Sequence, residues 1–239
     1  MTNFVGASTP LTLDGLRQAA NILRTDAASV LAIIDVETSG CGFFPSRQPA
    51  LLFERHIFHR ETGGEWDETH PDLSSAKPGG YGPSSEQYAR LERAADLSRP
   101  AALRSASWGI GQVMGFNHRP AGYGTVEDMI ALFCDGEDEQ LAGSARFCVH
   151  AGLDVHLRHR DWSAFARGYN GPGYADHAYD VRLAAAYERH NRPQSIDFEV
   201  RDLQVHLMFA GYYRGRIDGL YGPRTREAEG RSHAFGGAA

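Results

Sequence analysis

The sequence predicts a mainly α fold with one small β-sheet, in which a helical domain precedes a small C-terminal helical module. Several separated segments repeat apolar residues at three- and four-residue spacing, as amphipathic helices do, whereas only short stretches alternate as strands do. The helical pattern stops at His190, a proline follows, and the pattern restarts near residue 195. We therefore divide the chain into a domain of residues 1–192 and a module of residues 195–239.

The N-terminal part predicts two helices. The first, residues 12–23, begins at Thr12, a residue type that caps helices. Asp26 can cap the second, residues 27–37, which is apolar on more than one face and is therefore expected to be central. Its core-facing positions recur at i, i+3 and i+4, and Glu37 follows at i+7. The sequence thus places a carboxyl group on the core side of a central helix.

Residues 42–58 change from helical spacing to alternation. Pro45 and Pro49 bracket a turn, and the alternation after them predicts a short hairpin running to residue 58. On this strand Glu54 shares a face with Leu52, His56 and Phe58. A stretch rich in Gly, Pro, Ser and acidic residues follows over residues 61–83, which predicts a long surface loop.

The rest of the first domain alternates between helices and one tight strand-and-turn element. The expected element at residues 105–115 is punctuated by glycines. In the module, we expect a helix with Val200, Leu203 and Leu207 inward, followed by a Gly-rich turn with several tyrosines. The helices expected in the first domain cover residues 84–97, 125–133, 137–152, 161–169 and 176–190.

Composition and charge exclude several classes of protein. No stretch approaches the roughly 20 apolar residues of a membrane span, and the N-terminus lacks the pattern of a Sec signal peptide. A net charge of −6 argues against a nucleic-acid binder, which needs a basic surface. Cys41, Cys134 and Cys148 match neither a disulfide framework nor a zinc pattern, so we expect reduced, packed thiols.

Two glutamates are candidates for chemistry. A carboxyl group kept in an apolar environment stays protonated near neutral pH and can donate a proton to a leaving group. Glu37 meets this description, although it could instead cap its helix or pair with Arg47 or Arg55. Glu54, 17 residues later on the expected hairpin, could face it across a groove as a second carboxylate. The alternative for Glu54 is an exposed ion pair with Arg55 or Arg60.

Metal and nucleotide sites are not indicated. His56 and His59 lie near two glutamates, but on the expected strand they would point to opposite faces, and no His-Glu-x-x-His helix occurs. The segment around Gly109 and Gly111 contains neither the lysine of a phosphate-binding loop nor a full Gly-x-Gly-x-x-Gly motif. We expect no metal and no organic cofactor.

Three stretches, VETSGCGFFPSRQPALLFERHIFHRETGG, SASWGIGQVMG and ARGYNGPGY, carry Glu-Thr, Gly-x-Gln and Tyr-Asn-Gly in that order. In this respect residues 10–190 resemble the N-acetylmuramidase domain of phage endolysins. That domain belongs to the lysozyme-like superfamily, which includes goose-type lysozymes and lytic transglycosylases. The resemblance implies a lysozyme-like fold with a cleft between the helices and the small sheet.

The resemblance also implies roles for individual residues. Glu37 corresponds to the catalytic acid, and Thr38 replaces the usual serine. Glu54 stays open as a second carboxylate, because several members of the superfamily use one glutamate. The residues implied in sugar binding are Ser107, Gln112, Tyr169 and Asn170.

The tail carries Leu-Gln and then Gly-Tyr-Tyr-x-Gly-x-Ile-Asp-Gly-x-Tyr-Gly-x-x-Thr, and it resembles a peptidoglycan-binding module. In that family another helix with Ala-Val-x-x-Phe-Gln follows. Here REAEGRSHAFGGAA departs from it, so a shortened or partly ordered end is expected. The resemblance assigns wall binding to Tyr212, Tyr213, Asp218 and Tyr221. The sequence is equally consistent with a role for these residues in packing the core of a small domain.

The sequence therefore predicts a monomeric peptidoglycan hydrolase that cleaves the β-1,4 bond between N-acetylmuramic acid and N-acetylglucosamine. The alternatives are a lytic transglycosylase using the same glutamate, a non-catalytic wall-binding protein and a metallopeptidase that cuts stem peptides. Without a Sec signal, we expect synthesis in the host cytoplasm and access to the periplasm or wall through a holin or a secretion machine.

Overall fold

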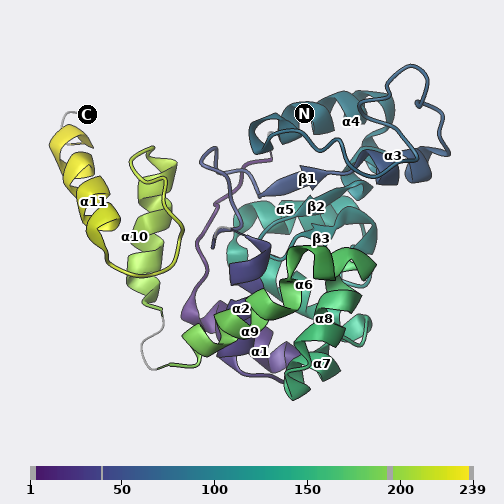
Figure 1. Cartoon of the computed structure of the whole chain (residues 1–239). Helices are drawn as coiled ribbons and strands as arrows, with labels where there is room; N and C mark the ends of the chain where they lie inside the picture. The colour runs from purple at the N-terminus through teal and green to yellow at the C-terminus, as the bar shows by residue number, and fades with distance from the viewer. Residues whose placement is uncertain (1–3, 39, 193–195, 237–239) are drawn as a thin grey trace.

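The computed structural model describes residues 4–38, 40–192 and 196–236, and it shows a helical lobe built around a small sheet with a pair of C-terminal helices beside it (Figure 1). The predicted mainly α class is confirmed. In the described ranges no helix is both long and apolar enough to cross a bilayer.

The α-helices are α1 (Leu13–Leu23), α2 (Ala27–Glu37), α3 (Arg55–Thr62), α4 (Gln87–Arg104), α5 (Val126–Asp135), α6 (Glu137–His150), α7 (Asp154–His159), α8 (Trp162–Asn170), α9 (Tyr179–His190), α10 (Phe198–Phe209) and α11 (Pro223–Gly236). The strands are β1 (Leu51–Phe53), β2 (Ala106–Trp108) and β3 (Val113–Met114), and the 3-10 helices are η1 (Ser84–Glu86), η2 (Gly115–Asn117) and η3 (Pro172–His177).

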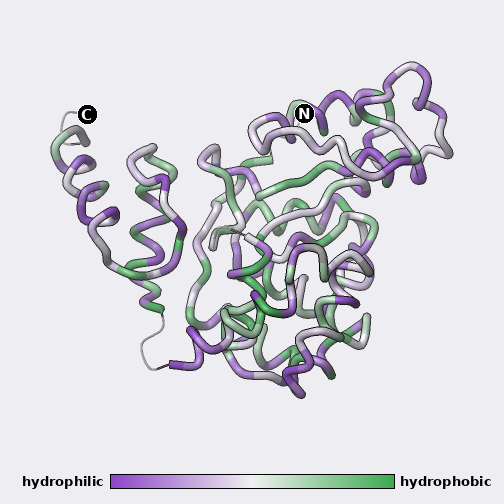
Figure 2. Tube along the Cα trace, viewed as in Figure 1, coloured by the Kyte–Doolittle hydropathy of each residue, from purple (hydrophilic) through white to green (hydrophobic). Residues whose placement is uncertain are grey.

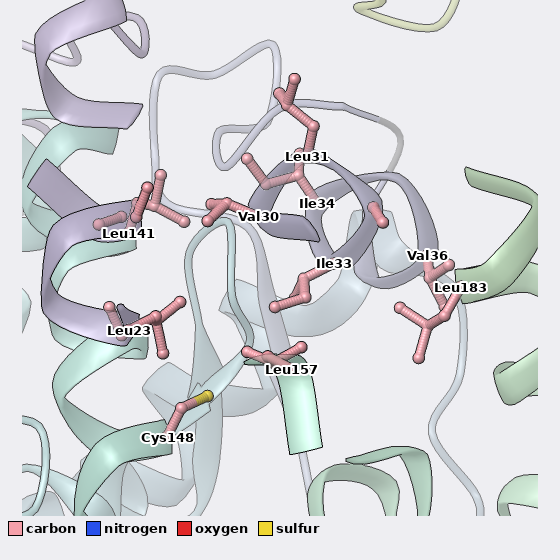
Figure 3. Packing of buried hydrophobic residues seen from close by; sticks show 14 of the residues in the cluster. Leu23, Val30, Leu31, Ile33, Ile34, Val36, Leu141, Cys148, Leu157 and Leu183 are labelled. Atoms are coloured by element: carbon pink, nitrogen blue, oxygen red, sulfur yellow. The ribbon is translucent and has the colours of Figure 1, made fainter. Parts of the chain in front are cut away.

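Helix α2 lies at the centre of the larger core. The Asp26 carboxylate caps it by accepting a hydrogen bond from the backbone N–H of Ser29 at 2.8 Å. Its apolar side chains point in different directions, with Val30 toward Leu141 and Val36 toward Leu183 (Figure 3). Each fully buried side chain of this size stabilises the fold by about 1.5–3 kcal/mol. The helix is therefore held on all sides, as its hydrophobic pattern predicted.

The sheet has the order β1-β2-β3 and is antiparallel throughout. In register, Leu52 lies opposite Ser107, and Trp108 lies opposite Val113. Trp108 is fully buried and donates from its indole nitrogen to the backbone carbonyl of Leu103 at 3.1 Å. The strand-and-turn element expected at residues 105–115 is confirmed as the β2–β3 hairpin.

The strand predicted for residues 51–58 is wrong beyond Phe53. β1 is an edge strand, and its pairing with β2 ends where Phe53 meets Ala106. The backbone carbonyl of Glu54 then accepts a hydrogen bond from the amide of Phe58, and α3 begins. The rings of Phe53 and Phe58 lie 5.7 Å apart between centroids. Burial of both rings is therefore achieved by a helical turn, although the apolar pattern also allows a strand.

Most predicted helices are confirmed, with differences at two places. α4 continues to Arg104 through a kink at Ser98, so Pro100 lies within it instead of beyond its end. α7 was not predicted, because Leu157 is its one buried residue and so short a helix gives almost no periodic signal. The expected long loop between α3 and α4 is present, and Figure 2 shows it as a largely hydrophilic projection.

The C-terminal module, residues 196–236, packs against the segment that follows α2. Cys41 and Phe43 share a buried cluster with residues of α10 and of the turn after it, among them Val205 and Ile217. The expected inward face of α10 is only partly right. Leu207 is buried, but the deepest residues of the helix are others, Arg201, Gln204 and Val205.

The end of the module is helical. The chain continues into α11, which extends to Gly236, so the departure from the family's motif still permits a helix. Residues 237–239 lie outside the described ranges.

Candidate active site

Glu37 is the last residue of α2, at the point where the helix leaves the core. Thr38 ends the helix, and its backbone N–H and hydroxyl both donate to the carbonyl of Ile34, at 3.1 and 3.0 Å. Because most of α2 is buried, the direction in which the Glu37 side chain leaves it is fixed. The side chain is half-buried and lines a cavity of about 300 Å³.

The cavity beside Glu37 has one apolar side and a small number of polar groups, as small-molecule sites generally do. It is formed by the end of α2 and the segment after it, by β1, by the start of η1 and by the β2–β3 turn. Its polar lining residues are Glu37, Thr38, Ser84 and Gln112, and its apolar ones are Cys41, Phe43, Phe44, Ala50, Leu51 and Leu52. Larger cavities, of about 410, 430 and 420 Å³, lie elsewhere in the described residues, and none of these three is lined by Glu37 or Glu54.

The environment of Glu37 favours its protonated form. Burial raises its pKa from an ordinary value of 4.5 to about 7, against the opposing effects of the Asn170 amide and the Arg182 guanidinium. Arg182 is exposed to solvent and donates to the backbone carbonyl of Val36 at 3.0 Å, so its charge is partly screened. Desolvation therefore prevails, and Glu37 holds a proton it can donate near neutral pH.

The two arginines that could have paired with Glu37 make other contacts. Arg47 donates to the backbone carbonyl of Ala7 at 2.9 Å, and Arg55 donates to that of Pro71 at 3.5 Å. Within the described parts of the chain, Glu37 therefore forms an ion pair with neither Arg47 nor Arg55.

Glu54 lies at the end of β1, two residues after Leu52 of the cavity wall, but it does not itself line the cavity. One of its carboxylate oxygens lies 3.2 Å from Nδ1 of His56. Burial raises the pKa of Glu54, and His56 and the hydroxyl of Tyr81 act in the opposite direction. Glu54 is therefore a second carboxyl group with a raised pKa beside the same wall, and not part of an exposed arginine pair.

Ser107 and Gln112 contact each other across the β2–β3 hairpin. The Ser107 hydroxyl donates to the side-chain oxygen of Gln112 at 2.8 Å, and the amide nitrogen of Gln112 donates to the carbonyl of Gly109 at 2.9 Å. Gln112 lines the cavity and has a φ of 48°. Ser107 is buried, so of the two residues it is Gln112 that reaches the cavity.

Tyr169 and Asn170 end α8 next to Glu37. The Tyr169 hydroxyl donates to the carbonyl of Gly111 and contacts the Ser144 hydroxyl at 3.1 Å, which ties α8 to the hairpin. The amide nitrogen of Asn170 is buried and makes no hydrogen bond within the described residues. That nitrogen faces the acid, and its interaction with the carboxylate is one of the two effects that lower the pKa of Glu37.

Tyr81 and Arg182 were not identified from the sequence. Tyr81 belongs to the long loop and reaches Glu54 from 27 positions away, and Arg182 lies among the polar residues of an amphipathic helix. No local pattern marks either residue.

His56 and His59 lie on α3, so their expected placement on opposite faces of a strand is wrong. His59 contacts Asp67 at 2.7 Å, and His56 contacts Glu54. No group of three potential ligands from His, Cys, Asp and Glu is positioned for a metal ion within residues 4–38, 40–192 and 196–236.

The four residues predicted for wall binding separate into two pairs. Tyr213 is buried and donates to the carbonyl of Arg216, and Asp218 accepts hydrogen bonds from Gln204 and the backbone N–H of Leu220. Those two residues hold the turn together. Tyr221 is 45% exposed, and Tyr212 lines a small surface cavity that Tyr213 also reaches. The charged residues of that cavity are Arg214, Arg224, Glu227 and Arg231.

The chain is similar to known proteins over its first domain. A family model described as N-acetylmuramidase matches residues 26–191. The crystal structure of the Burkholderia AP3 phage endolysin superposes with a TM-score of 0.71 at 38% sequence identity, covering 76% of this chain and 71% of that one. No curated protein sequence matches significantly. The family match includes Glu37 and Glu54 and ends before the C-terminal module.

Proposed function

Since the chain belongs to the N-acetylmuramidase family, we propose that Glu37 is the general acid that protonates the departing sugar oxygen. The chain is a peptidoglycan hydrolase and acts as a glycoside hydrolase. We further propose that the bond cleaved is the β-1,4 bond that follows N-acetylmuramic acid. The observation that carries the assignment of Glu37 is its half-buried carboxyl group, with a pKa of about 7, in the cavity wall.

The proposed reaction consumes one water molecule. Glu37 transfers its proton to the glycosidic oxygen as the C–O bond breaks, and positive charge develops on the sugar ring. Water then adds to the anomeric carbon, and Glu54 accepts the proton that this water loses. Exchange with solvent returns both carboxyl groups to their starting states. The amide of Asn170 lies beside the acid, and in this proposal it holds an N-acetyl or hydroxyl oxygen of the substrate there.

Digestion of purified sacculi tests the assignment of the acid. Glu37→Gln keeps the shape of the side chain but cannot donate a proton, so we expect fragment release to fall by about 10²–10⁴-fold. Glu92→Gln, at an exposed position of α4, is the matched control and should retain full activity. An active Glu37→Gln enzyme with native circular dichroism would reject the assignment.

A lytic transglycosylase is the second candidate, because Glu54 stands outside the cavity lining and a single glutamate suffices for that reaction. Hydrolysis produces reducing muramic acid ends, whereas transglycosylation produces anhydro ends that are lighter by one water. Mass spectrometry of the released fragments distinguishes the two. If all released fragments carried anhydro ends, the enzyme would be a lytic transglycosylase and not a hydrolase.

For the C-terminal module we propose a wall-binding role carried by Tyr212 and Tyr221. Tyr221 is the more exposed of the two, so Tyr221→Ala tests the surface with little effect on packing. We expect weaker sedimentation with sacculi and unchanged turnover of soluble glycan fragments. Unchanged sedimentation would remove Tyr221 from the proposed surface.

A further inference from the structure

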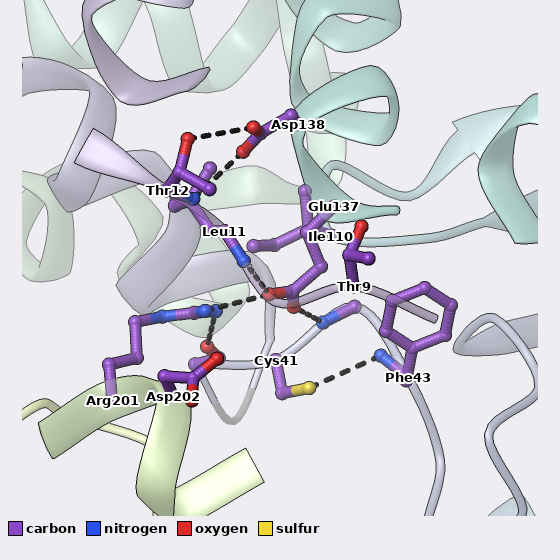
Figure 4. A network of polar contacts seen from close by, with 12 residues as sticks. Thr9, Leu11, Thr12, Cys41, Phe43, Ile110, Glu137, Asp138, Arg201 and Asp202 are labelled. Atoms are coloured by element: carbon purple, nitrogen blue, oxygen red, sulfur yellow. Dashed lines mark hydrogen bonds and ion pairs between the residues drawn. The ribbon is translucent and has the colours of Figure 1, made fainter. Parts of the chain in front are cut away.

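A fully buried ion pair joins the C-terminal module to the first domain. Arg201 of α10 lies 2.7 Å from a carboxylate oxygen of Glu137, the first residue of α6, and the side chains are 1% and 0% exposed (Figure 4). Burial opposes ionisation of Glu137, but Arg201 and two backbone N–H groups hold its pKa below the ordinary value. The N-terminus of α6 also favours a negative charge at this position. Glu137 is thus a charged group that the module neutralises.

This pair holds the segment that leaves Glu37 and forms one wall of the cavity. Arg201 also donates to the carbonyl of Gly40 at 2.7 Å, and Glu137 accepts from the backbone N–H of Gly42 at 2.5 Å. Between these anchors lies Cys41, which lines the cavity. On its other side the same segment packs on the module through the cluster of Cys41 and Phe43 with α10 and the following turn.

A second arginine of the module holds the other side of Glu37. Arg216 donates to both the backbone carbonyl and the carboxylate of Asp35, at 2.7 and 2.8 Å. Asp35 stands two residues before Glu37 and also pairs with Arg189 and His190 of α9. The last turn of α2 is therefore bound on one side by the first domain and on the other by the module.

We propose that Arg201 and Arg216 are positioning residues for catalysis, through which the module fixes the backbone on both sides of Glu37. This inference rests on the proposed role of Glu37 as the acid. The module then has two functions, since it sets the geometry of the reaction as well as any contact with the wall. The module binds Asp35 and Gly40 directly, and Glu137, which Arg201 neutralises, binds Gly42, so the backbone is held at these three positions.

Turnover of soluble glycan fragments tests this proposal, because such substrates do not require attachment to an insoluble wall. A misplacement of about 1 Å at a reacting group can lower the rate about 10²-fold. Arg216→Gln keeps Asp35 paired with α9, so it should fold, and we expect kcat to fall roughly tenfold with KM little changed. Arg17→Gln, an arginine of α1 that is 64% exposed, is the matched control and should have wild-type kinetics.

Arg201 provides a graded test. Arg201→Lys keeps the charge but not the two-pronged contact, and Arg201→Met keeps only the length of the side chain. We expect kcat to decrease in the order wild type, Lys, Met, at temperatures where circular dichroism shows each variant to be folded. If Arg201→Met does not fold, Arg216→Gln and Arg201→Lys decide the matter.

The outcomes separate this inference from the proposed function. Wild-type kcat in folded Arg216→Gln and Arg201→Lys would overturn the positioning role and leave the role of Glu37 intact. A raised KM with unchanged kcat would also overturn it, because that pattern reports lost binding. An active Glu37→Gln enzyme, measured in parallel, would overturn the proposed acid instead.

Discussion

Burial of Glu37 favours its protonated form and makes its ionisation costly for the folded protein. Its pKa of about 7, against an ordinary 4.5, is a difference of about 2.5 units. At roughly 1.4 kcal/mol per unit, ionising Glu37 in the folded protein costs about 3 kcal/mol more than in the unfolded chain. At alkaline pH the free energy of unfolding is therefore lower with Glu37 than it would be with an uncharged side chain at this position.

The first prediction concerns the stability of Glu37→Gln as a function of pH. Between pH 4.5 and 7 the folded protein binds more protons at Glu37 than the unfolded chain, so this residue makes the unfolding free energy fall as pH rises. Relative to wild type, Glu37→Gln should gain up to about 3 kcal/mol between pH 4 and pH 8. Urea unfolding of both proteins at the two pH values measures this gain. A difference independent of pH would contradict the raised pKa.

The second prediction concerns Glu54→Gln. If Glu54 takes the proton from the attacking water, its amide variant should lose about 10²–10⁴-fold in kcat on soluble fragments. His56→Gln is the companion variant, because the imidazole favours the ionised form of Glu54, and its loss should move the acidic limb of kcat to higher pH. A loss of less than about threefold in Glu54→Gln would support a mechanism with one glutamate.

At the level of elements, the sequence predicts what depends on local pattern. The caps Thr12 and Asp26, the central α2 and the β2–β3 hairpin were all expected from spacing and residue type, and all are present. The end of β1 was not, because it depends on where its partner strand stops. The pairing of Glu54 with Tyr81 likewise depends on how a long loop folds back, and no periodicity encodes that.

Gly40 is the element-scale test of the contact between the α2 segment and the module. Its φ is +93°, and a Cβ there would lie 1.9 Å from the carbonyl oxygen of Ile217. Gly40→Ala should therefore lower the unfolding free energy by more than the roughly 1 kcal/mol of backbone strain alone, by up to about 3 kcal/mol.

Gly63→Ala is the control for that measurement. Gly63 also has a positive φ, of +66°, but a Cβ there meets nothing within 4 Å. It should show the strain without the contact, so the difference in unfolding free energy between the two variants isolates the approach of the module. Equal losses in the two variants would mean that the approach at Ile217 has no energetic consequence.

At the scale of the whole molecule, the boundary near residue 193 separates two sequence patterns, but the buried cluster of the module is completed by residues of the first domain. The module shares its buried cluster with Cys41 and Phe43 of the first domain. Arg201 was overlooked because a charged residue on a predicted helix is normally assigned to the solvent face, and only its distant partner Glu137 makes burial possible. Domain division from composition cannot reveal such a pair.

The last prediction is that the chain unfolds as one unit. The module is too small to bury much apolar surface alone, and melting it would expose Cys41 and Phe43 and remove the ion-pair partner of Glu137. Removing one member of such a pair costs about 3–5 kcal/mol. Calorimetry should therefore show one transition whose calorimetric and van't Hoff enthalpies agree. Arg201→Met should lower its midpoint by roughly 10 °C, at about 2–4 °C per kcal/mol for a chain of this size. Two resolved transitions, with the larger one unmoved in Arg201→Met, would instead show that the module melts independently and that its arginines do not support the fold around Glu37.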